Sequence, residues 1–287
     1  MARIAVIGQG AFGRALAHVF GMAGHDLSVF GRDYPAWIDA DYIFLAVPTG
    51  AVEGVLAALE SASGPVLILC AKGFLPDGRL PSEAIPGGWD YAVLSGPGFA
   101  AELVDGLPTI HSIAARADLA RRLAAELSTP KFRLYWSDDL RGVQLCGALK
   151  NIMAIAAGLC AGLGLGENAR AALITRGANE LRRGVIALGG REETLWSPAG
   201  LGDLILTCTS AQSRNFRFGE ALARGQSAGA AQAALGTVEG LAALRALTRA
   251  VDHAQMPITA MLGDVVEGRV APDQALDMLM QRPIVSG

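Results

Sequence analysis

The first thirty residues hold the feature that most restricts the fold of this chain. A short β-rich run at residues 3–7 leads into the sequence GQGAFG at residues 8–13, and residues 14–23 then have the apolar spacing of a helix. Glycines allow a tight turn and close backbone approach, so the free N–H groups at the start of the helix can face a pyrophosphate. A second strand at residues 26–30 completes a βαβ unit of about the usual 30 residues, so we expect an N-terminal Rossmann-like sheet that binds a dinucleotide. The glycines expected at the cofactor are Gly8, Gly10 and Gly13.

The residues after the second strand bear on the choice of cofactor. A site specific for NAD usually places a carboxylate there, which accepts hydrogen bonds from the ribose hydroxyls. This chain has Gly31 and Arg32 instead, and a guanidinium can meet the oxygens of a 2′-phosphate. We expect NADP to be preferred, with NAD still usable because Asp33 follows one position later. The alternative is that Arg32 is an exposed loop residue without a role in binding.

The link after the second strand is short. Only residues 31–41 separate it from the next apolar strand at 42–47, where a Rossmann sheet normally inserts a helix, a further strand and another crossover. One crossover alone needs about 10 to 12 residues. We therefore expect the usual third strand to be missing and strand 26–30 to lie at the sheet edge. Because an unprotected edge can pair with another chain, residues 31–41 or a partner subunit should cover it.

The rest of the N-terminal half continues the α/β pattern. Further strands are expected at residues 66–70, 92–94, 108–114 and 131–136, with helices at 51–59 and 118–127. Two loops directly follow strands, AKG at 71–73 and SGPGFA at 95–100, and loops at the carboxyl ends of parallel strands face the ligand crevice. The sequence SDD at 137–139 precedes a mostly helical half. We expect a dinucleotide-binding domain with a parallel sheet at 1–137 and an all-α substrate and catalytic domain at 138–287.

The stretch at residues 142–166 opens the helical half and is almost wholly apolar. A helix without a polar face is covered by protein on all sides, so its Lys150 would be desolvated. Desolvation lowers the pKa of an ammonium group, which suits a lysine to acid–base catalysis near neutral pH. Gln144 and Asn151 lie two turns apart on one face, and Gly147 leaves room for close approach. The alternative is a core lysine that reaches the surface or pairs with a carboxylate.

Composition and spacing argue against several classes of protein. The uncharged run from 152 to 166 is shorter than the roughly 20 residues of a membrane span and holds four glycines. The net charge of −3, without a basic stripe, argues against nucleic-acid binding. The four cysteines lack CxxC spacing and indicate reduced thiols, the four histidines form no metal-binding pair, and no signal peptide is apparent. We expect a cytoplasmic protein with no metal, no membrane insertion and a small-molecule ligand.

Two polar motifs of the second half could hold a ligand. AGLGD at residues 199–203 presents one carboxylate on a glycine turn. SRN at 213–215 places hydroxyl, guanidinium and amide donors side by side before a helix, which suits an anion. The nearby Arg217 and Arg224 are better explained as a solvated face. We therefore expect the SRN motif to bind the anionic part of a substrate.

In combination these motifs resemble the bacterial NAD(P)-dependent glycerol-3-phosphate dehydrogenases over nearly the whole chain. The resemblance rests on residues 8–13, 71–73, 95–97, 142–145, 149–151, 199–203, 207–209, 213–215 and 238–240. It implies a cytoplasmic homodimer that reduces dihydroxyacetone phosphate to sn-glycerol 3-phosphate, which feeds phospholipid synthesis. It also implies NADP or NAD as the cofactor.

The resemblance further implies roles for individual residues, with Lys150 as the catalytic acid and base. The residues implied at the substrate are Lys72, Gly96, Gly98, Lys150, Asp203, Ser213, Arg214 and Asn215. Those implied at the cofactor, besides the three glycines, are Ala11, Phe12, Arg32, Lys72, Ala100, Arg214, Thr237 and Glu239. Two features depart from the family: Gly98 stands where a serine or threonine is usual, and the 31–41 link lacks the usual extra segment.

Two other functions stay open at this point. A reductase of a small hydroxy acid could share the two-domain build, although the neighbouring Arg214 and Asn215 favour a phosphate over a carboxylate. The shortened first domain could also belong to an NADP-binding sensor without turnover.

Overall fold

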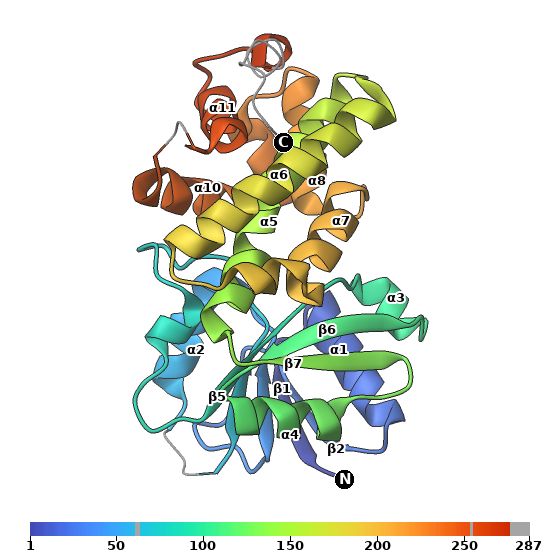
Figure 1. Cartoon of the computed structure of the whole chain (residues 1–287). Helices are drawn as coiled ribbons and strands as arrows, with labels where there is room; N and C mark the ends of the chain where they lie inside the picture. Colours follow the sequence, from blue (N-terminus) through green and yellow to red (C-terminus); the bar gives the residue numbers. More distant parts are fainter. Residues whose placement is uncertain (61–63, 253–254, 276–287) are drawn as a thin grey trace.

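The computed structural model describes residues 1–60, 64–252 and 255–275 and places a sheet-containing half beneath a helical half (Figure 1). One seven-stranded sheet has the order β2-β1-β3-β4-β5-β6-β7. The strands are β1 (Arg3–Ile7), β2 (Asp26–Phe30), β3 (Tyr42–Leu45), β4 (Val66–Leu69), β5 (Tyr91–Ser95), β6 (Thr109–Ala114) and β7 (Phe132–Ser137). The expected α/β class with a Rossmann-like sheet is confirmed.

The expectation of a parallel sheet is wrong at one pair of strands. β5 and β6 run antiparallel, with Val93 opposite Ala114, whereas the other five pairs are parallel. The helix between them, α3 (Ala100–Val104), has only five residues, and a parallel crossover needs a longer connection. The chain therefore enters β6 at the end of the sheet where it left β5.

β2 lies at the edge of the sheet, and no described strand pairs with its outer side. The usual third strand is therefore missing, as expected. The link of residues 31–41 packs on a face of the sheet, and the expectation that the link or a partner subunit covers this edge stays a prediction. Its Ile38 and Ala40 pack in one cluster with Ile7 of β1. The link thus takes the place of a crossover helix.

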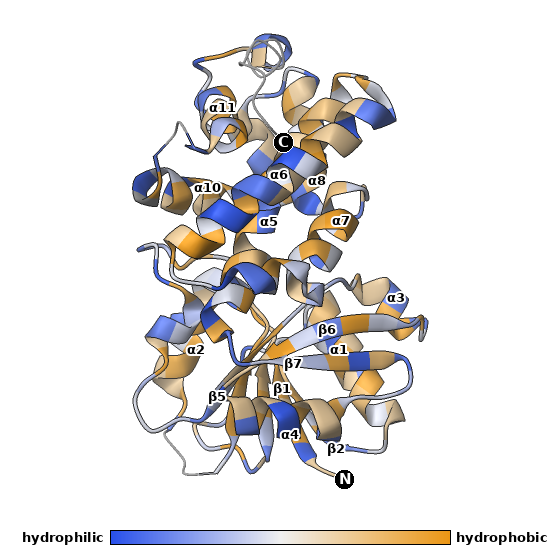
Figure 2. Cartoon of the chain, viewed as in Figure 1, coloured by the Kyte–Doolittle hydropathy of each residue, from blue (hydrophilic) through white to orange (hydrophobic). Residues whose placement is uncertain are grey.

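Helices cover both faces of the sheet, and in Figure 2 the strands in the middle of the sheet are mostly orange, the colour of apolar residues, while β7 and α4 carry blue patches. On one face lie α1 (Ala11–Met22) and α4 (Ala117–Leu127), which enclose buried side chains such as Phe20. On the other face lie α2 (Val52–Ala58) and the first turn of α5 through Val143. The loops between these layers carry the motifs at 71–73 and 95–100 toward the helical half.

The helical half is built around α5 (Leu140–Gly162). Its N-cap residue is Asp139, whose side chain accepts a hydrogen bond from the N–H of Gly142 at 2.9 Å. The other helices are α6 (Gly166–Ala187), α7 (Asp203–Cys208), α8 (Arg214–Ala223), α9 (Ala228–Leu235), α10 (Glu239–Ala250) and α11 (Pro257–Val266). Short helical turns are η1 (Thr49–Ala51), η2 (Pro81–Ala84), η3 (Glu192–Trp196) and η4 (Pro198–Gly202). Residues 276–287 of the expected second domain lie outside the described residues.

α5 is buried along nearly its whole length, as the apolar sequence predicts. It is long and apolar enough to cross a membrane, but 89% of its most apolar window is buried inside the protein, so it is a core helix. Glycines let its neighbours come close. A Cβ at Gly158 would lie 1.9 Å from the carbonyl oxygen of Phe216 on α8, and one at Gly147 would lie 2.7 Å from Ser95 Oγ at the end of β5. The close approach expected at Gly147 is confirmed.

Candidate functional site

The glycine turn between β1 and α1 leaves open space before the helix. Gly8 has φ +118°, in the left-handed region that favours glycine, and a Cβ there would lie 2.3 Å from the carbonyl oxygen of Ala46. A Cβ at Gly13 would lie 1.9 Å from the carbonyl oxygen of Gly8, so α1 packs directly on the turn. A Cβ at Gly10, the N-cap of α1, would meet no atom within 4 Å. The first N–H groups of α1 therefore face room for a pyrophosphate.

Two of the three lysines of the chain meet on one carboxylate. Lys150 Nζ donates to Asp203 Oδ1 at 2.5 Å and to Thr207 Oγ1 at 2.8 Å. Lys72 Nζ donates to Asp203 Oδ2 at 2.8 Å and to the carbonyl oxygen of Gly96 at 2.6 Å. Lys150 is 6% exposed and Asp203 2%. This lysine cluster joins two loops of the sheet to the centre of α5 and the start of α7.

Asp203 is held in place by the turn that precedes it. It is the first residue of α7 and follows the π-helical turn η4. A Cβ at Gly200 would lie 2.2 Å from the carbonyl oxygen of Leu195, so η4 packs tightly on η3. One turn later, Thr207 Oγ1 donates to the backbone oxygen of Asp203 at 2.6 Å. The sequence analysis gave Thr207 no role, although its spacing of four residues from Asp203 on a helix was a signal that the two meet.

Burial and neighbouring charges set the protonation of the lysine cluster. Burial lowers the pKa of Lys150 to about 8; the Asp203 carboxylate opposes this change, and the Lys72 cation adds to it. Burial by itself would raise the pKa of Asp203, but the ammonium groups of Lys150 and Lys72 outweigh it and the pKa is lowered. Lys150 can therefore gain or lose a proton near neutral pH while Asp203 stays ionised.

Two buried amides connect the lysine cluster to the helices above it. Asn151 Nδ2 donates to the carbonyl oxygen of Lys72 at 3.0 Å, and its Oδ1 accepts from Asn215 Nδ2 at 2.9 Å. Asn215 Oδ1 accepts in turn from the N–H of Gly240 at 3.0 Å. The amides thus link the loop after β4 to α5, α8 and α10. Asn215, expected at the substrate, has both of its polar atoms engaged within the protein.

The SRN motif lies at the start of α8, as expected. Ser213 is the N-cap, and its Oγ accepts from the N–H of Phe216 at 3.2 Å. The Arg214 side chain is exposed and makes no hydrogen bond or ion pair with any described residue. Its charge also acts on Glu239. Burial raises the pKa of Glu239, and the hydrogen bond from Thr49 and nearby cations, Arg214 among them, oppose this rise. The guanidinium is therefore free to bind a ligand.

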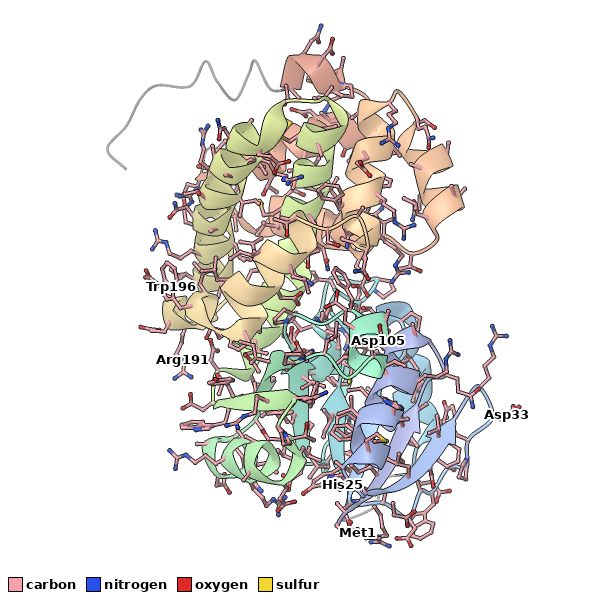
Figure 3. The ribbon with its side chains drawn as sticks, turned by 90° about the vertical axis from the view of Figure 1, so that its right-hand side faces the viewer. Met1, His25, Asp33, Asp105, Arg191 and Trp196 are labelled. Carbon is pink, nitrogen blue, oxygen red and sulfur yellow. The ribbon has the colours of Figure 1, made fainter. Side chains whose placement is uncertain are left out.

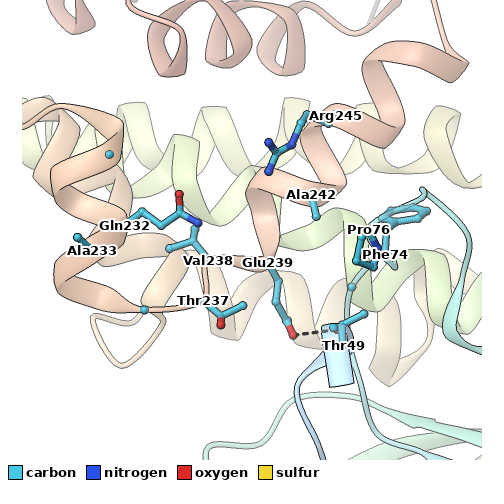
Figure 4. Close-up of a pocket in the computed structure, with 14 residues that line it drawn as sticks. Thr49, Phe74, Pro76, Gln232, Ala233, Thr237, Val238, Glu239, Ala242 and Arg245 are labelled. Atoms are coloured by element: carbon cyan, nitrogen blue, oxygen red, sulfur yellow. Dashed lines mark hydrogen bonds between the residues drawn. The ribbon is translucent and has the colours of Figure 1, made fainter. Parts of the chain in front are cut away.

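A cavity of about 750 Å³ lies between the two halves beside Glu239 (Figure 4). Thr49 Oγ1 donates to Glu239 Oε1 at 3.2 Å across this boundary, along the dashed line in Figure 4. Thr237 and Arg245 also line the cavity. Thr237 and Glu239, both expected at the cofactor, therefore face one space. Thr49 was missed as a site residue, although a polar side chain near the carboxyl end of a parallel strand was the available signal.

The remaining residues expected at the cofactor come from α1, α3 and the loop after β2. Ala11 and Phe12 form the first turn of α1, and Ala100 begins α3. Arg32 is exposed and makes no hydrogen bond or ion pair within the described part of the chain. Figure 3 shows its neighbour Asp33 at the outer edge of the sheet half. Arg32 therefore lies on the rim of the protein. The alternative of an exposed loop residue without a role in binding predicts the same position.

Comparisons with known proteins agree with the geometry. Residues 34–120 match the family model for the N-terminus of NAD-dependent glycerol-3-phosphate dehydrogenase, and residues 139–277 match the model for its C-terminus. The glycerol-3-phosphate dehydrogenase (NAD(P)+) of Cereibacter sphaeroides is 45% identical, over 98% of this chain and 99% of that protein. The enzyme of the same name from Agrobacterium fabrum is 41% identical, over 99% and 98%. The first alignment spans 308 positions, more than the 287 residues of this chain, so that relative has residues which this chain lacks.

Solved structures give the same result. The glycerol-3-phosphate dehydrogenase of Coxiella burnetii is 34% identical with a TM-score of 0.86, over 98% of this chain and 99% of that one. That of Saccharomyces cerevisiae, at 21% identity and a TM-score of 0.79 over 97% and 99%, shares the fold. The two family models together match most of the chain, and both relatives exceed 40% identity over almost its full length. The chain therefore belongs to the NAD-dependent glycerol-3-phosphate dehydrogenase family.

Proposed function

We infer that this chain catalyses the reversible, NAD(P)-dependent reduction of dihydroxyacetone phosphate to sn-glycerol 3-phosphate. Relatives named glycerol-3-phosphate dehydrogenase (NAD(P)+) support the reaction and the use of NAD or NADP. The observation that carries the mechanism is Lys150, buried on Asp203 with a pKa of about 8. A group that releases and regains a proton near neutral pH is what the interconversion of a ketone and an alcohol requires.

Lys150 acts at the oxygen of the reacting carbon. Its ammonium group has three N–H donors, of which Asp203 and Thr207 engage two, so one is left for a ligand. The nicotinamide, when bound, supplies the hydride in reduction and accepts it in oxidation. In reduction the Lys150 ammonium group donates its proton to the carbonyl oxygen, and in oxidation the neutral amine takes a proton from the hydroxyl. Asp203 and Thr207 hold the amine in a fixed orientation for both directions.

The site favours an anionic substrate. Lys72 and Lys150 bring two positive charges to the single carboxylate of Asp203, so the cluster has an excess of positive charge. Arg214 at the first position of α8 binds the phosphate with its guanidinium, assisted by the backbone N–H groups of Arg214 and Asn215 in the first turn of the helix. Binding of this remote phosphate positions the carbonyl against Lys150. The further substrate contacts proposed are with Gly96 and Gly98.

The cofactor lies along the glycine turn and the cavity between the halves. The open space at Gly10 fits a pyrophosphate on the N-terminus of α1. The contacts proposed besides Gly8, Gly10 and Gly13 are Ala11, Phe12, Lys72, Ala100, Arg214, Thr237 and Glu239. Arg32 binds the 2′-phosphate, which gives NADP the preference over NAD.

One assay separates the proposed activity from its alternatives. Purified protein is mixed with NADPH and dihydroxyacetone phosphate, and the loss of NADPH absorbance is followed at saturating substrate. We expect steady oxidation of NADPH. A small keto acid that supports turnover in place of the phosphorylated ketone would indicate the hydroxy-acid reductase. NADPH that binds without turnover on any of these substrates would indicate a sensor.

The proposal extends to the setting of the enzyme. We place it in the cytoplasm as a homodimer without membrane insertion, supplying glycerol 3-phosphate for phospholipid synthesis, with a dinucleotide-binding domain at 1–137 and a catalytic domain at 138–287. The boundary is supported by the change from β7, which ends at Ser137, to α5, which begins at Leu140. Light scattering on the purified protein would test the dimer, and a monomer mass at micromolar concentration would contradict it.

A further inference from the structure

The side chain of His111 is buried without a hydrogen-bond partner. It lies on β6 at 0% exposure, and neither of its ring nitrogens bonds any described residue. Its ring lies 4.9 Å from that of Phe132 and 6.3 Å from that of Phe12, measured between centroids. Buried polar atoms almost always have a partner, and an exception at a functional site calls for an explanation. An ordered water or a ligand that reaches the ring would supply this partner.

The His111 ring fills the space that a side chain at position 98 would occupy. A Cβ at Gly98 would lie 2.8 Å from His111 Cε1 and 3.0 Å from Nε2, which is too close for an alanine or a serine without movement. A Cβ at Gly96 would lie 2.7 Å from His111 Cα. His111 is therefore packed directly against the loop after β5, and it reaches the place where the missing side chain of residue 98 would project.

His111 also lies within the electrostatic field of the lysine cluster. Burial lowers its pKa to about 3, with a further lowering by Lys72 and Lys150 that Asp203 opposes. Lys72 in turn bonds the carbonyl oxygen of Gly96, the residue packed on His111. The imidazole is therefore neutral at working pH, with one N–H donor and one acceptor nitrogen that are both unused.

We propose that His111 binds the substrate directly, by a hydrogen bond between its neutral imidazole and a hydroxyl or carbonyl oxygen of the three-carbon phosphorylated ligand. The inference rests on the proposed function and assigns a contact that Gly98 cannot make. A ring nitrogen takes the place of the side-chain group that residue 98 lacks. The ring comes from β6, thirteen residues later in the sequence. Binding of the ligand supplies the partner that the buried imidazole lacks.

The main test compares His111→Leu with the wild-type enzyme. Leucine is similar in size and has no polar atom, so we expect the KM for dihydroxyacetone phosphate to rise about 5- to 12-fold, as for one lost hydrogen bond, while the KM for NADPH stays unchanged. The melting temperature without ligand should stay equal or rise, because an unpaired buried polar group is removed. The increase in melting temperature caused by glycerol 3-phosphate should shrink. His18→Leu, at an exposed histidine on α1, is the control and should match the wild type.

A second pair of variants tests whether a side chain at position 98 and the His111 ring compete for the same space. Gly98→Ser by itself should lower the melting temperature, because its Cβ meets the imidazole. Gly98→Ser combined with His111→Val should recover the melting temperature and much of the affinity for dihydroxyacetone phosphate, because the hydroxyl then occupies the space of the ring. If the losses of melting temperature and affinity caused by the two substitutions add in the double variant, the hydroxyl does not take the place of the ring, and this part of the proposal is overturned.

The outcomes are distinguishable. A wild-type enzyme that does not reduce dihydroxyacetone phosphate would refute the proposed function. A wild-type enzyme that does reduce it, with an unchanged KM in His111→Leu, would overturn only the role of His111 and show that the ring is a packing element. A change confined to the KM for NADPH would also overturn it, because the imidazole would then serve the cofactor. If His111→Leu does not fold, the ring nitrogens of wild-type His111 should still shift in a ¹⁵N spectrum on addition of glycerol 3-phosphate, and no shift would contradict the proposal.

Discussion

Lys150 and Arg32 are two cations with a role in the proposed function, and the structure places them in opposite environments. Lys150 is 6% exposed at the centre of α5, with two acceptors within 2.8 Å. Arg32 is exposed after the edge strand β2 and bonds no described residue. The protein itself fixes the protonation and orientation of the first, whereas only a bound ligand can orient the second. Substitutions at the buried cation should therefore have large effects, and substitutions at the exposed one small and salt-dependent effects.

The largest effect is expected from Lys150→Ala. Loss of the proton donor should lower kcat by about 10² to 10⁴, while NADPH binding and folding stay nearly intact because the glycine turn is untouched and Asp203 keeps Lys72. The measurements are kcat and the dissociation constant for NADPH. Lys131→Ala removes the one remaining lysine, which is exposed, and should behave as wild type. A Lys150→Ala enzyme with more than half of the wild-type kcat would show that the buried lysine is only structural.

Arg214→Lys tests a third cation, whose environment differs from those of Lys150 and Arg32. Its side chain is exposed, but it lies at the N-terminus of a helix. The planar guanidinium can pair with two phosphate oxygens and an ammonium cannot, so the KM for dihydroxyacetone phosphate should rise roughly 10- to 100-fold, as for a lost charge-assisted hydrogen bond of about 1.5 to 3 kcal/mol. The KM for NADPH should change far less. Arg217→Lys on the next turn of α8 is the matched control, since that side chain is also exposed. Equal effects on the two KM values would rule out the phosphate contact.

The pH dependence sharpens the comparison without a substitution. The pKa of Lys150 is lowered to about 8, and reduction needs the ammonium form, so kcat/KM for dihydroxyacetone phosphate should be level below this pH and fall about tenfold per pH unit above it. Oxidation needs the neutral amine and should show the opposite profile, rising up to about pH 8. Profiles of the two directions, recorded at constant ionic strength, provide the measurement. A reduction profile that stays level to pH 10 would mean that Lys150 is not the acid.

The smallest effect is expected from Arg32→Ala. A charge-assisted hydrogen bond to the 2′-phosphate should give the wild type a preference for NADPH over NADH of about tenfold, and the variant should come close to parity. The quantity to compare is kcat/KM for each nucleotide, at low and at high salt, because salt screens an exposed arginine. Arg249→Ala, at an exposed arginine in the last turn of α10, is the control. Unchanged discrimination would show that Arg32 points to solvent.

The parts of the fold that were predicted correctly depend on residues close together in the chain. The glycine turn at 8–13, the buried helix around Lys150 and the missing third strand each follow from a local pattern or from a chain length. The antiparallel β6 was missed because alternating strands and helices suggest a parallel crossover, and the five residues of α3 are too few to make one. Thr49 and Thr207 were missed as site residues because single threonines are common and carry little information by themselves.

The sequence by itself determined that Lys150 would be buried, because its neighbours along α5 leave no polar face for water. Only the tertiary structure decided which groups share its environment. Lys72 and Asp203 are 131 residues apart, and their contact depends on how the loop after β4 meets the turn before α7. In the same way, Gly98 could be recognised from the sequence as lacking a hydroxyl, but the imidazole that fills its space comes from another strand. The pKa of a buried group and the partner of a buried polar atom depend on distances through space, and those distances exist only once the chain has folded.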